Sequence, residues 1–209
     1  AGTGRINYVR NSVKATVDAY DGPVTLYAWD MEDPLLQAWS EAFPGALTPL
    51  SEMSADLMSH VRYPQDLLKI QRMMLSRYHV TDPESYYTGQ DFWAVPSDPT
   101  MASQDQPTYY QSLAMPGQES PSFSLTTTFI PTGSGREILR GFLAADADAG
   151  NVAGQKAESY GTLRLLELPR ASAVDGPGQV QNQIEVSTER SQDPSEQLNL
   201  SQFIAQNRQ

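Results

Sequence analysis

Few side chains in this chain could take part in acid–base catalysis. The chain contains two histidines, His60 and His79, and no cysteine. A histidine base needs an orienting carboxylate within hydrogen-bond reach, and Asp18 and Asp30 are the candidate partners. The G-x-S-x-G pattern of many hydrolase nucleophiles does not occur. A hydrolase or transferase is therefore one hypothesis, and the alternative is that both histidines cap the ends of helices.

A second group of side chains could bind an anion, because guanidinium and ammonium groups suit phosphate oxygens. It consists of Arg62, Lys69, Arg72 and Arg77. Residues 15–61 contain eight acids and residues 78–135 contain six, and neither stretch contains Lys or Arg. Two alternatives follow. The basic residues bind an anionic lipid or sugar phosphate, or they pair internally with the flanking acids.

Neither a metal site nor a cofactor is predicted. No H-E-x-x-H motif, EF-hand loop or phosphate-binding G-x-x-x-x-G-K-[ST] loop occurs. The carboxylates before Pro34 are typical of a helix start. The formal net charge of −11 argues against nucleic acid as a partner, since phosphate binding requires a basic surface. No apolar run reaches the ~18 residues that span a bilayer.

The first element that must position these groups is a predicted β-hairpin from Ser12 to Asp30. Val13, Ala15 and Val17 alternate with polar residues, and the alternation resumes at Val24, which is typical of half-buried strands. A two-residue loop at Asp21-Gly22 would pair Val17 with Leu26. Pro23 cannot donate the hydrogen bond that closes such a turn, so a wider loop is the alternative. Either loop places the apolar residues on one side.

Helices are predicted next, and each has a recognisable start. Asp33-Pro34 is an N-cap followed by proline, and the apolar face after it consists of Leu35, Leu36, Trp39 and Phe43. A short helix is predicted over residues 54–60. The strongest helical pattern follows Tyr63-Pro64, with a buried stripe predicted at Leu67, Ile70, Met74 and Tyr78.

The rest of the chain is rich in strand patterns, at residues 108–115, 122–130, 138–145 and 162–168. Residues 146–159 offer little to bury and are predicted to form a mobile loop, and helices are predicted at 179–186 and 195–206. The sequence thus predicts an α+β fold, mostly an antiparallel sheet with helices packed on it, and extended Pro/Gly-rich loops. Residues 1–209 are expected to form one module, and the alternative is two lobes, 1–100 and 101–209.

Several ordered motifs resemble one bacterial family of multi-pass membrane proteins, uncharacterised protein family 0182. They are "INYVRNSVKATVDAYDG", "FPGALTPLSEM", "HVRYPQDLLKIQRMMLSRYHVTDPESYY", "DFWAVPSDP", "YGTLRLLELPR", "DGPGQVQNQIE" and "SQDPSEQLNLSQ". The resemblance covers nearly the whole chain. It implies membrane helices before this chain, a large domain outside the cytoplasm that contains it, and a parent that continues past Gln209.

The absence of a nucleophile motif and of metal-ligand spacing, together with the resemblance, leads us to expect a non-catalytic extracytoplasmic domain that serves assembly, ligand capture or contact with the cell envelope. Its expected partners are the remainder of its own membrane protein and an envelope lipid or other envelope component. Under the enzyme hypothesis, an envelope component would be the substrate.

Overall fold

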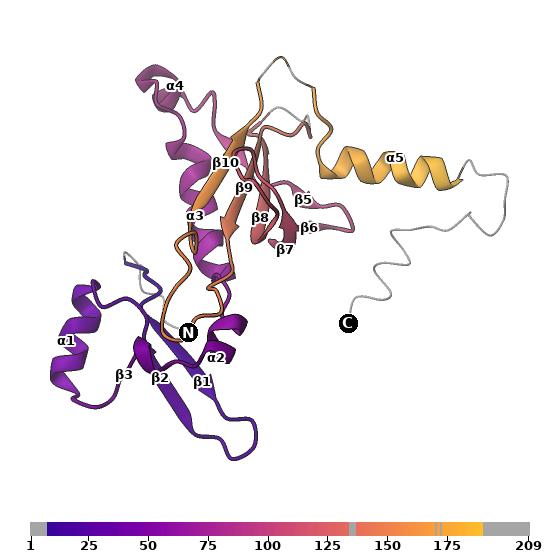
Figure 1. Cartoon of the computed structure of the whole chain (residues 1–209). Helices are drawn as coiled ribbons and strands as arrows, with labels where there is room; N and C mark the ends of the chain where they lie inside the picture. Colours follow the sequence, from indigo (N-terminus) through magenta and orange to yellow (C-terminus); the bar gives the residue numbers. More distant parts are fainter. Residues whose placement is uncertain (1–7, 134–136, 170, 172, 190–209) are drawn as a thin grey trace. The chain divides into compact units, whose positions relative to one another are not determined.

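The computed structural model describes residues 8–133, 137–169, 171 and 173–189, without the side chains of residues 102, 188 and 189 (Figure 1). The chain divides into two compact units. Unit 1 comprises residues 1–68 and 146–162, and unit 2 comprises residues 69–145 and 163–209. These units differ from the two lobes suggested as the alternative to a single module. No helix among the described residues combines the length and apolar character needed to span a membrane.

Unit 1 contains a three-stranded sheet in the order β1-β2-β3. β1 (Val13–Val17) and β2 (Val24–Ala28) form the predicted antiparallel hairpin, and β3 (Thr48–Pro49) adds in parallel. The wider loop is confirmed, because Val17 pairs with Val24 and the Asp18 amide donates to the Pro23 carbonyl at 3.0 Å. The pairing of Val17 with Leu26 was wrong by two residues. A shift of two keeps every side chain on its side of the sheet.

The face of the hairpin that is buried differs from the expected one. Val17 and Val24 are 64% and 60% exposed, and Leu26 is 37% exposed. The opposite face carries Tyr27, which is buried, and packs on the core of the unit. Trp29 and two methionines build that core, so the large aromatic rings determined which face turned inward. The core cluster is Tyr27, Trp29, Met53, Met58 and Ala149.

Three helical elements surround this sheet: α1 (Pro34–Ala42), the 3₁₀ turn η1 (Leu50–Glu52) and α2 (Ala55–His60). Residues 146–159, predicted as a mobile loop, instead complete the unit. Ala147 and Ala149 are fully buried, and the Gly154 amide donates to the Met53 carbonyl at 2.9 Å. The prediction failed because small alanines and glycines carry no apolar signal but allow close backbone packing.

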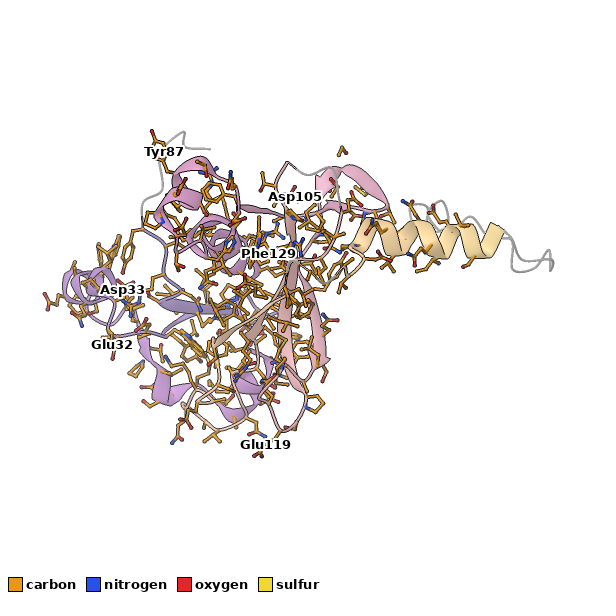
Figure 2. The ribbon with its side chains drawn as sticks, turned by 90° about the horizontal axis from the view of Figure 1, so that it is seen from above. Glu32, Asp33, Tyr87, Asp105, Glu119 and Phe129 are labelled. Carbon is orange, nitrogen blue, oxygen red and sulfur yellow. The ribbon has the colours of Figure 1, made fainter. Side chains whose placement is uncertain are left out.

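Unit 2 is built on a mostly antiparallel sheet in the order β10-β9-β8-β4, in which β7 also pairs with β8. Phe129, labelled in Figure 2, and Leu125 are fully buried on β8, and Leu143 is buried on β9. The strand bounds are β4 (Trp93–Ala94), β7 (Tyr109–Leu113), β8 (Ser122–Pro131), β9 (Gly141–Asp146) and β10 (Leu163–Glu167). All four predicted strand patterns, at residues 108–115, 122–130, 138–145 and 162–168, are thereby confirmed.

The helices of this part are α3 (Gln65–Tyr78), which begins in unit 1, α4 (Pro83–Thr88) and α5 (Pro177–Glu189). A two-stranded sheet is formed by β5 (Ser97–Asp98) and β6 (Met101–Asp105). The helix predicted at 179–186 is confirmed within α5, whereas the one predicted at 195–206 lies outside the described residues. The α+β class is also confirmed.

The predicted buried stripe of α3 was wrong. Met74 and Tyr78 are 54% and 66% exposed, and the buried positions are Leu68, Arg72 and Ser76. These three recur at a spacing of four residues, so one helical face is still selected. Two of the three are polar, and their side chains are hydrogen-bonded: Arg72 donates to Thr127 Oγ1 on β8, and Ser76 Oγ donates to the Met73 carbonyl within the helix.

Candidate functional site

Unit 1 carries an apolar groove of about 680 Å³ between the segment that enters β1 and helix α1. This volume lies within the range of small-ligand and side-chain pockets. We call it the α1 groove, and it is lined by Tyr8, Val9, Arg10, Asn11, Ser12, Val13, Leu26, Asp33, Leu35, Leu36, Trp39, Phe43, Ala46 and Leu47.

Helix α1 supplies the aromatic wall of this groove. Leu35, Trp39 and Phe43 recur every four residues and therefore form one stripe. Their side chains are 53%, 63% and 52% exposed, although Leu36 on the adjacent face is buried. The Trp39 and Phe43 rings stack with centroids 4.9 Å apart. The wall is thus a pre-ordered apolar surface with nothing described packed over it.

The polar groups at the start of α1 hold the groove together. Asp33, labelled in Figure 2, caps the helix by accepting a hydrogen bond from the Leu35 amide at 2.9 Å. Its carboxylate also accepts hydrogen bonds from the hydroxyls of Ser12 and, at 2.8 Å, Tyr8. The bonds from Ser12, Tyr8 and Leu35 hold the pKa of Asp33 below its ordinary value, and the bond to Asp33 raises the pKa of Tyr8.

An ion pair fastens the same segment on its other side. Arg10 Nε lies 2.6 Å from Asp30 Oδ2, and this pairing raises the pKa of Arg10. Asp30, considered as a catalytic partner, is therefore occupied by a guanidinium. Together with the bonds of Asp33, the pair anchors residues 8–12 beside α1, so the polar side chains of the groove bond to one another. This arrangement suits the binding of an apolar group better than a reaction.

The two histidines lie at helix ends, as the capping alternative expected. His60 Nδ1 is 2.7 Å from the Asp56 carbonyl oxygen at the end of α2. His79 has its ring nitrogens 2.8 Å and 3.0 Å from the carbonyl oxygens of Leu75 and Asp91, and its ring stacks on Trp93 at 3.5 Å. Among the described residues, neither histidine forms an ion pair with a carboxylate.

The remaining candidate acid, Asp18, shapes the hairpin loop. Its side chain accepts a hydrogen bond from the Tyr20 amide at 2.8 Å, which is the usual behaviour of aspartate in turns. The described residues therefore do not assemble the histidine–carboxylate pair on which the hydrolase or transferase hypothesis depends.

The four basic candidates are divided between the units. Arg62 belongs to unit 1, where Nη1 donates to the Ser59 carbonyl at 2.7 Å and lies 3.5 Å from Asp148. The other three, Lys69, Arg72 and Arg77, follow one another on α3 in unit 2.

Arg72 and Arg77 contact other residues of unit 2. Arg72 is buried and donates from Nη1 to the Gln106 carbonyl at 3.0 Å and to Thr127 Oγ1 at 3.3 Å. The guanidinium of Arg77 lies 5.9 Å from the centre of the Phe92 ring. These contacts hold the side chains to their own unit, and the anion site stays a prediction.

Sequence reasoning missed both the α1 groove and a half-buried lysine. The apolar face of α1 was predicted, but a helix with both Leu35 and Leu36 on that face has more apolar surface than one neighbour covers. Lys14 lies on the inward face of β1 with its ammonium 5.2 Å from the Trp29 ring centre, and burial lowers its pKa to about 8. The sequence did indicate that Lys14 lies on the opposite face of the strand from Val13 and Ala15, and this opposite face is the one that turned inward.

Comparisons with known proteins agree with the sequence motifs. Residues 1–197 match the model of the Uncharacterised protein family (UPF0182). A UPF0182 protein of Paenarthrobacter aurescens (strain TC1) is 64% identical over 181 residues, which cover 85% of this chain and 18% of the relative. One of Kineococcus radiotolerans is 58% identical over 193 residues, covering 88% and 19%.

A third relative, UPF0182 protein CMS1887 of Clavibacter sepedonicus, is 51% identical over 207 residues, covering 95% of this chain and 21% of the relative. The chain therefore spans about a fifth of the length of the curated relatives it matches. No solved structure matches it. Since the family model covers nearly all of its residues, the chain belongs to the uncharacterised protein family UPF0182.

Proposed function

We propose that this chain is a non-catalytic module of a large multi-pass membrane protein, lies outside the cytoplasm, and captures an apolar ligand in the α1 groove. The resemblance of its motifs to the family supports the membrane context and the extracytoplasmic side. The groove supports ligand capture. The module would thus serve the protein through binding, while other parts of the polypeptide carry out whatever else the protein does.

One observation carries the binding proposal: Leu35 and Trp39 of α1 and its C-cap residue Phe43 stay more than half exposed beside a groove of about 680 Å³. Fully burying one such side chain stabilises a complex by about 1.5–3 kcal/mol. Contiguous exposed apolar surface is unusual on a protein that works alone and is typical of interaction sites.

The polar residues of the groove favour the same interpretation. Asp33 accepts hydrogen bonds from Tyr8, Ser12 and Leu35, and Arg10 is paired with Asp30. A ligand that enters the groove therefore leaves the Asp33 carboxylate with its hydrogen-bond donors, and an unpartnered buried carboxylate would be a main cost of desolvating such a site. Its affinity would come from apolar contact with Trp39 and Phe43.

The proposal is tested by titrating the 209-residue chain with the neutral apolar dye N-phenyl-1-naphthylamine. We expect saturable binding at one site and about tenfold weaker binding for Trp39→Ala, equivalent to about 1.4 kcal/mol of lost apolar contact. Tyr87→Ala is the matched control, because Tyr87 is an aromatic residue of unit 2 that is 93% exposed outside the groove. Absence of saturable binding, or equal losses in both variants while thermal unfolding is unchanged, would contradict the proposal.

A further inference from the structure

We propose that the occupant of the α1 groove is a segment of the same polypeptide outside these 209 residues, apolar on one face and flanked by Lys or Arg. This inference rests on the proposed function and names its ligand. The bound segment would extend from the groove across the exposed face of the β1–β2 hairpin, so that the groove and this face form one docking surface.

The exposed hairpin face is continuous with the groove. Val13 and Leu26 line the groove and are 36% and 37% exposed. Val17 and Val24, which pair with each other further along the hairpin, are 64% and 60% exposed on the same side. Within the part of the chain that the structure describes, an exposed sheet face therefore lies next to an exposed helix face.

The dimensions suit a peptide segment. From Val13 to Val17 the hairpin face extends about 13 Å, at roughly 3.3 Å per residue. A helix of about nine residues has this length. A helical segment that carries apolar side chains at every third or fourth position would place them over the valines and then in the aromatic groove.

Charge identifies the flanks of the occupant. Asp18 and Asp21 lie in the hairpin loop, and Glu32 and Glu41 lie at the start and end of α1. All four are exposed, and none forms an ion pair with a described residue. The basic residues nearest to them have other contacts, because Arg10 in the groove pairs with Asp30 and Lys14 lies against the Trp29 ring on the inward face of β1. A partner with basic residues beside its apolar face would match this acidic border.

The same border disfavours the other occupants. A second copy of the chain would bring carboxylates against carboxylates, and an anionic lipid headgroup would be repelled. About four-fifths of the length of the curated relatives lies outside this chain, so a covalently attached source of segments exists. A tethered segment also binds at an effective concentration in the millimolar range, which compensates for a modest contact area.

The experiment uses overlapping 20-residue peptides that tile the rest of the Paenarthrobacter aurescens relative. Each is tested for displacement of N-phenyl-1-naphthylamine from the 209-residue chain. We expect displacement by one peptide or one overlapping group, with apolar residues at helical spacing and basic residues beside them. The affinity of that peptide should fall at least tenfold between 0.05 M and 0.5 M NaCl.

Two variants separate this inference from the proposed function. Val17→Ser/Val24→Ser removes apolar contact on the hairpin outside the groove and should weaken the peptide about tenfold while leaving dye binding unchanged. Asp18→Asn/Asp21→Asn should reduce the salt dependence of peptide binding. Tyr87→Ala should change neither the affinity of the peptide nor its salt dependence.

The inference would be overturned if the dye binds but no peptide displaces it, or if a displacing peptide is insensitive to both hairpin variants. It would also be overturned if phosphatidylcholine or phosphatidylglycerol vesicles displace the dye and no peptide does, or if self-association of the chain excludes the dye. In each of these cases saturable dye binding still supports the groove as an apolar site, whereas its absence contradicts the proposed function itself.

Discussion

Lys14 provides a quantitative test of how burial acts in unit 1. Its folded-state pKa of about 8 lies below the ordinary 10.5, because burial removes water from around the ammonium. This difference between the two pKa values corresponds to about 3.4 kcal/mol if the ammonium is fully removed from solvent. The side chain keeps some contact with solvent, so we discount the cost of the charged form to about 1–2 kcal/mol.

Lys14→Met is therefore expected to raise the free energy of unfolding by about 1 kcal/mol at pH 7. Methionine has a similar length and no charge, but it loses the contact of the ammonium with Trp29, worth about 0.5–1 kcal/mol. Between pH 8 and 10.5 the unfolded chain binds more protons at Lys14 than the folded chain, so the native protein gains stability as the pH rises. The difference in free energy of unfolding between Lys14→Met and the original protein should therefore decrease from pH 8 to pH 10.5.

The assay is urea unfolding of both proteins at pH values from 7 to 11, followed by tryptophan fluorescence. Other groups titrate in this range, so the informative quantity is the difference between the two proteins at each pH. Thr16→Val, which changes a non-titrating side chain on the same strand face, should give a pH-independent difference. A variant that is less stable at pH 7, or a difference that does not change with pH, would refute the reasoning.

Two further substitutions test packing in each unit. Arg72→Met removes the donor to the Gln106 carbonyl and to the hydroxyl of the buried Thr127, which should cost about 1–3 kcal/mol in urea unfolding. Gly154→Ala places a Cβ 2.5 Å from Ser51 Cα at a φ of +65°, so we expect a loss of about 2 kcal/mol or more, measured as a lowered thermal midpoint.

Each of these substitutions has a matched control. Gly22→Ala also requires a positive φ, +85°, but has open space around the new methyl group, so it should cost only about 1 kcal/mol. Equal losses at Gly22 and Gly154 would contradict the steric argument. For Arg72, the exposed Arg77→Met should cost less, and the reverse order would show that the hydrogen bonds to the β8 side are unimportant.

Local signals in the sequence were sufficient to locate most elements. Asp33-Pro34 and Asp82-Pro83 begin α1 and α4 because an aspartate cap and a proline at the first turn act within a few residues. The alternation of Val13, Ala15 and Val17 identified the hairpin for a similar reason. These preferences depend on the backbone of the segment itself and need no tertiary partner.

Which face an element buries was the part that could not be predicted. The hairpin turned its valines outward because Tyr27 and Trp29 bring more apolar area to the other side. On α3, Arg72 was buried in place of Met74 because Gln106 and Thr127 accept its hydrogen bonds. Both choices depend on residues distant in the sequence, and the α1 groove was missed for the same reason.

Unit 1 is assembled from two stretches of chain separated by roughly 80 residues that belong to unit 2. The core of unit 1 is complete only when the Tyr63 amide donates to the Ala147 carbonyl and the Gly154 amide donates to the Met53 carbonyl. A ribosome adding about 5–20 residues per second needs roughly 4–16 s to supply that interval. For this period the core residues Trp29, Met53 and Met58 lack the cover that Ala149 supplies. The unit therefore completes its folding only after its later stretch has been synthesised.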